Sequence, residues 1–593
     1  MMRPVLSSGP AMIHRLLDSV WGQATNLLTA PIRHKRWIDL LVLAAMGSTL
    51  AALWYVGLEW TAVQRHTVEI SLSAWALPKY LLLSLIRAIA AYALSLTFTL
   101  VVAYWAAKDP VAERILVPIL DILQSVPLLA FLPPVLLVML TLFPRSNVGL
   151  ELSAVLLIVT CQAWNMAFSF YQSLKALPKD LEETAALYGF SWLQKLRLVE
   201  LPFATPGLVW NSMVSVANSW FFLMSAEAFK AGDKNFQLPG VGSYMNAAVE
   251  QGNGRAQVYA ILTMLGLVVL LDQLVWRPVV AWSQRFQVDE GAEVEPGVNW
   301  LLRFLRRSRL LRWLEARRNH RLHLRRPRPA LLKRAEEGIT RPGRLAPWFA
   351  GSALLVVIGL LALGGLSVVR LLVDVRPGQW LHLLKAGGAS LSRVLLSTFL
   401  ATLWTLPVGL WIGMSPKWSR RLQSVVQVAA SFPSSLIFAS LILVFQGLGI
   451  GLGVSCVLLM VLSTQWYLLF NIIAGAQAIP MELREAARAF RLSLWRRCWS
   501  LYFPAVFPFL VTGWVTATGG AWNASIVTEI VTAKHQTLRT LGLGAEVVLA
   551  TDRGSMPDLA ASALLMAGMV VLFNRLVWGP LYRLAETRYA MNR

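Results

Sequence analysis

Long apolar segments recur along the chain, separated by short polar or basic stretches. The segments lie near residues 39–58, 84–107, 116–142, 148–170, 204–226 and 256–276, then near residues 347–371, 390–414, 421–446, 449–471, 505–529 and 559–578. Each is close to the ~20 residues that an α-helix needs to cross a bilayer. The alternating short strands of a membrane barrel are absent, so the pattern predicts an all-α integral membrane protein with about 12 transmembrane helices.

The third and ninth apolar segments contain prolines that we expect to disturb their helices. Pro127, Pro133 and Pro134 fall in the third segment, and Pro433 falls in the ninth. Because proline removes a backbone donor and clashes with the preceding turn, we expect these two helices to be kinked or broken.

The second half of the chain repeats the first. At an offset of 302 residues, "LVWRP" at 274–278 matches "LVWGP" at 576–580, and Glu227 matches Glu529. Earlier in each half, "SLIR" at 84–87 matches "SLSR" at 390–393 at an offset of 306. The repeat predicts two tandem six-helix units of the same orientation, with a pathway between them.

Charge supports a membrane protein and excludes a nucleic-acid partner. The chain is 56% hydrophobic and 14% charged, and its net charge is +23. The basic residues gather at the ends of apolar segments and in the connector between the halves, where residues 277–344 hold 17 Lys or Arg and 7 Asp or Glu, a surplus of 17 − 7 = 10. By the positive-inside rule this connector is cytoplasmic, and six segments per half place both termini there too. Its Leu and Trp residues between arginines would suit contact with anionic lipid headgroups.

Metal and disulfide chemistry find no support in the sequence. Cys161, Cys456 and Cys498 are scattered and odd in number, so we interpret them as packing residues. The seven histidines show no ligand spacing either.

Two polar stretches between apolar segments share one design. Residues 177–202, "LPKDLEETAALYGFSWLQKLRLVELP", have a proline and acids suited to a helix start and Gly189 suited to its end. Ser191 with Gln194 then fits a capping box that opens a second helix, expected to stop before Pro202. Residues 479–504, "IPMELREAARAFRLSLWRRCWSLYFP", repeat the design. Two rigid helical projections on one face would suit docking of two copies of another protein.

These loops resemble the EAA loop of the permeases of ATP-binding-cassette importers of the type I, binding-protein-dependent superfamily. The first loop has all the spacings of that motif: Glu183, Thr184, Ala185, Gly189, Leu201 and Pro202. The second has Glu485, Ala486, Ala487 and Pro504, but Arg491 stands where glycine is expected and Phe503 where leucine is expected. The departure leaves open whether the second loop turns in the same way.

The ends of the two units look like permeases of the nitrate, sulfonate, taurine and bicarbonate importer group. "WFFLMSAEAF" at 220–229 with "LPGVGSYM" at 238–245 carries this similarity, and "AWNASIVTEIV" at 521–531 is a looser version. The resemblance implies a fused double permease in a bacterial inner membrane, forming the translocation pathway for a small solute that is expected to be an anion. Its implied partners are two ATPase subunits, expected to be a homodimer, and a periplasmic or lipid-anchored substrate-binding protein. ATP and Mg²⁺ would be bound by those ATPase subunits, because this chain contains no Gly-Lys step and therefore no phosphate-binding loop.

The repeat and the resemblance together predict the following order along the chain. A leader (1–37), either amphipathic or a plain cytoplasmic tail, precedes a first helix and outer loop (38–80) and permease unit 1 (81–285). A basic cytoplasmic linker (286–346), a further helix and outer loop (347–385), permease unit 2 (386–585) and a cytoplasmic tail (586–593) follow.

Paired polar residues near the outer ends of the apolar segments are candidates for the pathway or an outer gate. Arg87 and Arg393 could form a positive ring that favours anions, although arginines at such ends usually reach headgroups. Glu227 and Glu529 are expected to hold the Gly-rich outer loops through backbone N–H groups rather than to touch solute. Asn218 and Asn523 could line the path or bond to neighbouring helices.

Two other functions remain open at this point. A twelve-span secondary transporter driven by an ion gradient would explain the duplication equally well, but not the paired loops. A membrane scaffold or signalling subunit is supported only by the basic connector.

Overall fold

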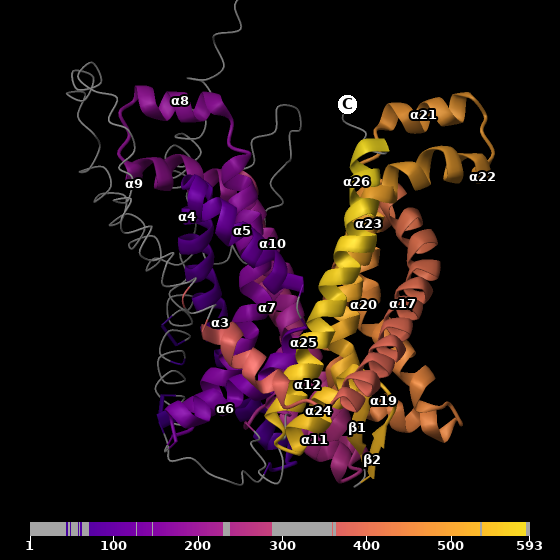
Figure 1. Cartoon of the computed structure of the whole chain (residues 1–593). Helices are drawn as coiled ribbons and strands as arrows, with labels where there is room; N and C mark the ends of the chain where they lie inside the picture. Colours follow the sequence, from indigo (N-terminus) through magenta and orange to yellow (C-terminus); the bar gives the residue numbers. More distant parts are fainter. Residues whose placement is uncertain are drawn as a thin grey trace, which may run out of the picture.

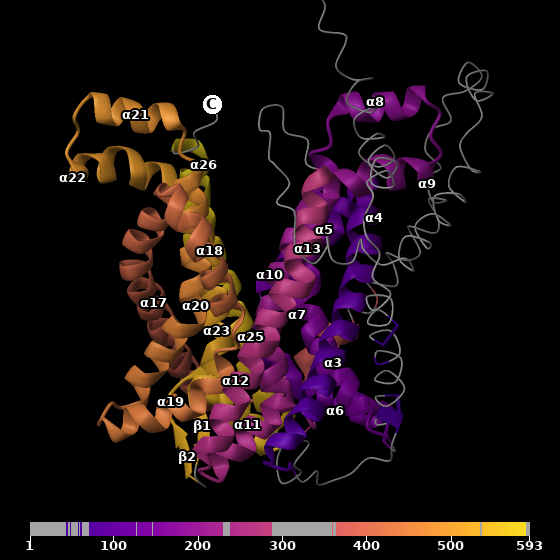
Figure 2. The same cartoon turned by 180° about the vertical axis from the view of Figure 1, so that it is seen from behind.

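The computed structural model describes residues 70–286 and 363–588 except 126, 145, 229–237, 534 and 535, with a few isolated positions between 43 and 61 and residue 359. The expected leader, the basic linker and most of the expected first helix of each half lie outside the described residues. Within them, the structure consists of two helical bundles that lie side by side (Figures 1 and 2).

The first bundle is built from one long helix after another. A 3₁₀ turn (Ala74–Ala76) leads into α3 (Leu77–Phe98), which continues through a π-turn (Thr99–Ala103) into α4 (Tyr104–Lys108). Its remaining elements are α5 (Pro110–Ser125), a 3₁₀ turn (Leu128–Phe131), α6 (Leu132–Leu142), α7 (Val148–Lys175), α8 (Lys179–Leu187), α9 (Trp192–Lys195), a π-turn (Leu196–Glu200), α10 (Leu201–Glu227), α11 (Val241–Glu250), α12 (Gly254–Leu271), a π-turn (Asp272–Trp276), α13 (Arg277–Ser283) and a 3₁₀ turn (Gln284–Phe286).

The second bundle repeats this order. Its elements are α17 (Pro377–Met414), α18 (Pro416–Ser431), α19 (Ser435–Gly447), α20 (Leu452–Gln477), α21 (Met481–Ala489), α22 (Leu494–Arg497), a π-turn (Cys498–Tyr502), α23 (Phe503–Thr528), β1 (Ile530–Ala533), β2 (Gln536–Arg539), α24 (Leu543–Asp552), α25 (Met556–Phe573), a π-turn (Asn574–Trp578) and α26 (Gly579–Arg588). The tandem repeat that the sequence predicts is therefore present in the structure.

Seven helices among the described residues are long and apolar enough to cross a membrane, or eight if one bent pair counts as a single span. That pair is residues 425–431 with 435–447, whose axes differ by 84° at the break around Pro433. The counterpart in the first half breaks between α5 and α6 at Pro127. The prediction that proline interrupts these two helices is confirmed, and both breaks place irregular backbone at the contact between the bundles.

The sequence pattern did not predict a small antiparallel hairpin, nor that α11 and α24 are helices where Gly-rich outer loops were expected. Strands β1 and β2 pair from Ile530 with Arg539 to Ala533 with Gln536. The hairpin directly follows α23 and packs at the end of the molecule where α11 and α24 lie (Figure 1).

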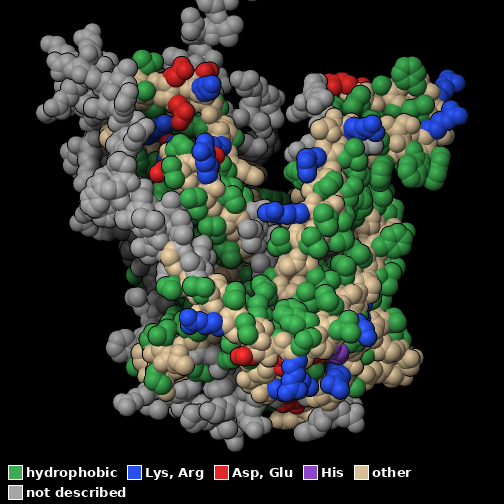
Figure 3. Space-filling view, viewed as in Figure 1, with side chains coloured by type: hydrophobic (Ala, Val, Ile, Leu, Met, Phe, Trp, Pro, Cys, Tyr) green, Lys and Arg blue, Asp and Glu red, His purple; other side chains and the backbone are tan. Residues whose placement is uncertain are grey.

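The two bundles meet at this same end and separate toward the other. One continuous cluster of buried apolar residues there includes members of both halves, such as Trp220, Met264, Trp522 and Met566. At the opposite end α8 and α9 lie far from α21 and α22, and the space-filling view shows a hollow between the halves (Figures 1 and 3). The molecule is thus closed at one end and open at the end that carries the two polar loops.

The contacts between the halves follow the repeat. The Leu129 N–H donates to Asn523 Oδ1 at 3.4 Å, and Ser435 Oγ donates to the Phe221 carbonyl at 3.1 Å. Leu129 and Ser435 are related by the offset of 306, and Phe221 and Asn523 by the offset of 302. Each broken helix therefore bonds to the long helix of the other half that precedes an outer loop.

Candidate docking loops and pathway

The first loop is a short capped helix followed by a tight left-handed turn. Gly189 adopts φ 62°, and a Cβ there would meet no atom within 4 Å, so backbone strain and not space favours glycine. The Gly189 N–H donates to Ala186 O, and the Phe190 N–H donates to Ala185 O at 3.1 Å. This pair of bonds is a Schellman motif, which fixes the direction in which the chain leaves α8.

The second loop turns in the same way despite its arginine. Arg491 has φ 46°, the positive value that glycine has in the first loop. Its N–H donates to Arg488 O, and the Leu492 N–H donates to Ala487 O at 3.2 Å. The departure from the motif thus leaves the turn unchanged, while a non-glycine residue in this region costs roughly 1–2 kcal/mol.

The two loops divide their motif residues between inside and outside. Glu183 and Glu485 are exposed, whereas Ala185 and Ala487 are buried under the turn, with 1% and 5% of their surface exposed. The predicted capping box at Ser191 is present, since the Ser191 N–H donates to Gln194 Oε1 at 2.8 Å. The arrangement holds each helix rigidly and directs one acid of each motif outward.

Ion pairs tie the first loop to the helices beneath it. Lys108 Nζ lies 2.7 Å from the buried carboxylate of Glu200, and Lys195 Nζ lies 2.9 Å from Glu182 and 3.7 Å from Glu200. The counterparts of these four residues in the second half are Met414, Tyr502, Arg497 and Arg484. The second loop therefore replaces a balanced group of two lysines and two glutamates by two arginines, a methionine and a tyrosine.

A further hydrogen-bonded group that includes an ion pair lies at the same end of the first bundle. Glu113 on α5 accepts hydrogen bonds from Lys175 Nζ at 2.7 Å and from the Tyr171 hydroxyl at 2.5 Å. These bonds lower the pKa of the Glu113 carboxyl and keep it charged.

The expectation that the loop helix stops before Pro202 is wrong. From α9 the chain passes through a π-turn directly into α10, with Pro202 in the first turn, and Pro504 has the same place in α23. A π-turn bonds each N–H one residue further back, which accommodates the missing proline N–H without ending the helix. Leu201 and Phe503 begin α10 and α23, so each loop is continuous with a long helix of its bundle.

At the closed end of the first bundle, Arg87 lies between two carboxylates. Its Nε and Nη2 bond to Glu151 at 2.5 and 2.7 Å, and its Nη1 bonds to Glu227 at 2.7 Å. The Arg87 and Glu227 side chains are completely buried and that of Glu151 is 2% exposed. A buried charge group of this kind is stable only when every member is paired, so it joins α3, α7 and α10.

Glu227 also holds the outer helix that follows. Its Oε2 accepts from the Gly242 N–H at 2.9 Å, while Ser84 Oγ donates to its Oε1 at 2.6 Å. A Cβ on Gly240 would lie 2.2 Å from this carboxylate, and one on Gly242 would lie 2.4 Å from the Met224 carbonyl. The two glycines let α11 approach the carboxylate this closely.

The second half keeps the carboxylate and changes the rest of the group. Glu529 accepts from the Gly544 N–H at 2.9 Å, from Ser390 Oγ at 2.6 Å and from Arg393 Nη1 at 2.9 Å. The place of Glu151 is taken by Gly453, and Arg393 Nη2 donates instead to Thr540 Oγ1, just after β2. The hairpin thus supplies the contact that a second carboxylate makes in the first half.

This geometry changes the interpretation of the two arginines. Neither forms the positive ring considered for the pathway, because Arg87 is buried between carboxylates and the side chain of Arg393, 14% exposed, pairs with Glu529. The sequence pattern missed Glu151 and Thr540. Glu151 stands inside an apolar segment, and no acid stands at its repeat counterpart. The one signal that could have identified it is that an acidic residue within a membrane span is unusual.

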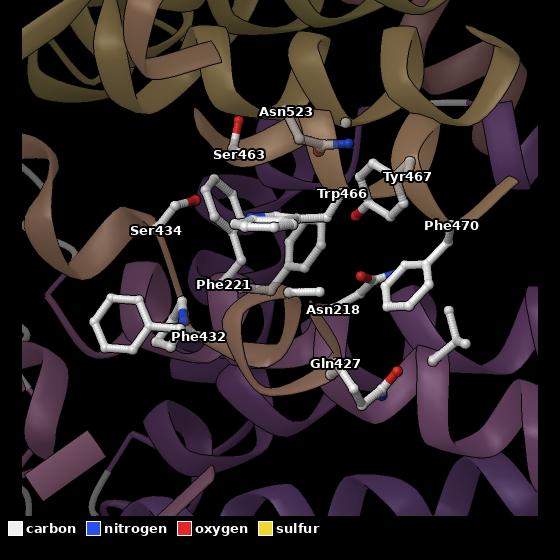
Figure 4. Close-up of a pocket in the computed structure, with 16 residues that line it drawn as sticks. Asn218, Phe221, Gln427, Phe432, Ser434, Ser463, Trp466, Tyr467, Phe470 and Asn523 are labelled. Atoms are coloured by element: carbon white, nitrogen blue, oxygen red, sulfur yellow. The ribbon is translucent and has the colours of Figure 1, made fainter. Parts of the chain in front are cut away.

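Asn218 and Asn523 line one pocket at the contact between the halves. The pocket lies between α10 of the first half and α18, α20 and α23 of the second, beside the break at Phe432–Ser434 (Figure 4). In contrast, Gln162, Asn165 and Asn211 each donate to a serine across α7 and α10, at 2.9, 2.9 and 2.8 Å. Some polar residues in spans therefore serve helix packing, and the two asparagines face the pocket.

Several transport permeases are similar to single units of this chain. A taurine transport system permease protein of Escherichia coli is 26% identical over 193 residues, 32% of this chain and 63% of the relative. A nitrate import permease protein of Synechococcus elongatus is 28% identical over 144 residues, 24% of this chain and 50% of the relative. A glycine betaine transport system permease protein of Bacillus subtilis is 23% identical over 238 residues, 39% of this chain and 79% of the relative. The chain thus spans between half and two thirds of the length of the first two.

A family model matches both halves of the chain. The model describes the inner membrane component of binding-protein-dependent transport systems, and it matches residues 79–275 and 405–585, more than half of the 593 residues. Each match contains one docking loop and one Glu–Gly contact to an outer helix. The chain therefore belongs to the family of binding-protein-dependent transport system inner membrane components, of which it carries two units in tandem.

Proposed function

We propose that this chain supplies both permease units of an ATP-driven importer for a small solute that is an anion or carries an anionic group. Two separate ATPase subunits would dock on the two loops, at 177–202 and 479–504. A substrate-binding protein would deliver the solute at the opposite end. The chain would lie in a bacterial inner membrane with the loops, both termini and the basic linker in the cytoplasm.

The observation that carries the proposal is the identical turn of the two exposed loops. Both end in a positive-φ residue with the same pair of hydrogen bonds, and both project from the end at which the halves separate. A capped helix that runs on into a membrane helix can transmit a push from a docked subunit to that helix. The same push on both loops would close the open end and open the closed one.

The solute class rests on the named relatives. Their names give taurine, nitrate, bicarbonate and glycine betaine as cargo. All four are small, and each is an anion or carries an anionic group. ATP hydrolysis would belong to the partner subunits, because no Gly-Lys step is present in this sequence.

Copurification with the ATPase tests the proposal. The chain is expected to leave the membrane in a stable complex with an ATPase, and replacing both Glu183 and Glu485 by Ala is expected to lower coupled turnover at least tenfold. The matched control replaces Asp180 and Glu482, two other exposed acids on the same helices that are related by the repeat, and should keep most of the turnover. Transport by the reconstituted chain alone, driven by an ion gradient, would instead establish the secondary transporter.

A further inference from the structure

The pocket between the halves has an unusual composition for a permease whose relatives carry anions. Its lining combines the aromatic rings of Phe221, Trp466, Tyr467 and Phe470 with the amides of Asn218 and Gln427. Among the described residues that line it, none is Lys, Arg, Asp or Glu. In Figure 4 Phe221 and Trp466 occupy the middle of the view, with Asn523 and Ser463 on one side and Asn218 and Gln427 on the other.

The pocket lies beside the seam that joins the two halves. Just beside it the halves are joined by the bonds from Leu129 to Asn523 and from Ser435 to Phe221. The aromatic contact of Phe221 with Phe438, at 6.0 Å between ring centres, closes the same seam. A solute that has passed the closed end would reach this pocket before the open hollow.

Among the described residues that line the pocket, none offers a fixed positive charge to an inorganic anion. The two paired arginines of the spans are engaged elsewhere, Arg87 by two carboxylates and Arg393 by one. Removing an oxyanion from water into a site without a cation costs several kcal/mol. The amide of Asn523 is already used, since its Nδ2 donates to Gly519 O and its Oδ1 accepts from Leu129.

Aromatic faces and free amides together suit a molecule with two different ends. A cationic ammonium gains about 0.5–2 kcal/mol over an aromatic face, most over tryptophan. The N–H groups of Asn218 and Gln427 can donate to a carboxylate or sulfonate. Resting on the proposed function and narrowing it, we infer that the permease pocket binds a small organic zwitterion, ammonium toward Trp466 and acid group toward Asn218, in preference to an inorganic oxyanion.

Saturation-transfer NMR on the full chain in lipid nanodiscs tests the inference without any partner subunit. The probes are glycine betaine and taurine, observed through their carbon-bound protons, with sodium nitrate and sodium bicarbonate as competitors. Transfer to both zwitterions is expected, and a tenfold excess of either salt should leave it unchanged. Trp466→Leu and Asn218→Leu should each weaken binding about tenfold, whereas Trp466→Phe should retain most of it.

The repeat provides a matched control. Trp164 is the counterpart of Trp466 on α7, packs against Phe98 at 5.5 Å and lies outside the pocket lining, so Trp164→Leu should leave binding intact. Displacement by nitrate, equal effects of Trp164→Leu and Trp466→Leu, or no transfer above empty nanodiscs would overturn the inference. Failure of the proposed function would show separately, as zwitterion binding by a chain that neither recruits an ATPase nor depends on Glu183 and Glu485.

Discussion

Arg87 and Glu227, 140 residues apart in the chain, lie 2.7 Å from each other with both side chains fully buried. Replacing Arg87 with Leu would leave two buried carboxylates without their cation, so we expect the free energy of unfolding to fall by about 3–5 kcal/mol. Arg393→Leu removes a partly exposed arginine beside a single carboxylate and should cost less. Thermal unfolding of the purified proteins in detergent, followed by intrinsic fluorescence, ranks the two variants, and equal losses would contradict the structure.

The glycines beside these carboxylates should tolerate no side chain. A Cβ at Gly242 would lie 2.4 Å from the Met224 carbonyl, and one at Gly544 would lie 2.5 Å from the Ser525 carbonyl. Gly242→Ala and Gly544→Ala should therefore each destabilise the protein by about 1–3 kcal/mol, through displacement of α11 or α24. Gly266→Ala is the control, because a Cβ there meets no atom within 4 Å and alanine favours the helix. Unfolding temperatures measured together test the contrast, which fails if Gly266→Ala is as damaging.

The strained turn of the second loop should be stabilised by a substitution that relaxes it. Arg491→Gly should relax the positive φ and stabilise the turn by roughly 1 kcal/mol, and Gly189→Ala should weaken the first turn by a similar amount. Hydrogen exchange of the amides that close each turn, at Leu492 and Phe190, reports the two effects locally. Unchanged exchange at Leu492 in Arg491→Gly would show that the loop is not strained.

The seam between the halves can be trapped chemically. Ser440 Oγ donates to Gln257 Oε1 at 2.9 Å across the closed end. In a double variant, Ser440→Cys with Gln257→Cys, we expect a crosslink with a short bifunctional reagent in the resting protein. In the proposed transport cycle, ATP with a docked ATPase subunit opens this end, so both together should slow the crosslink several-fold. Each single variant controls for the native cysteines, and a crosslinking rate that ATP leaves unchanged would argue against separation of the halves at this end.

Local patterns in the sequence predicted those features that depend on few neighbouring residues. The broken helices follow from Pro127 and Pro433, and the turn at Gly189 follows from its place after a capped helix. The bond from Glu227 to a backbone N–H of the Gly-rich outer segment was expected because an acid at that depth needs a partner and would repel an anionic solute. These features depend on residues close together in the sequence or on residues that occur at the same position of both repeat units.

Other features depend on packing between distant segments. The partner of Arg87 that neutralises it most directly, Glu151, lies 64 residues away and has no counterpart in the second half. Thr540 directly follows a hairpin, and the short, mixed sequence of that hairpin does not predict strands. The π-turn before Pro202 keeps a helix continuous where proline normally ends it. No periodicity in the sequence indicates these three features.

Glu151 and Gly453 occupy the same position in the two units, and one bonds to arginine while the other leaves room for Thr540. In a permease assembled from two identical chains, every substitution enters twice and must suit both sides at once. Covalent fusion removes that constraint, since a change is made on one side only and can be compensated there. In a fused chain of this kind the two sides are therefore free to take unequal shares of the transport cycle.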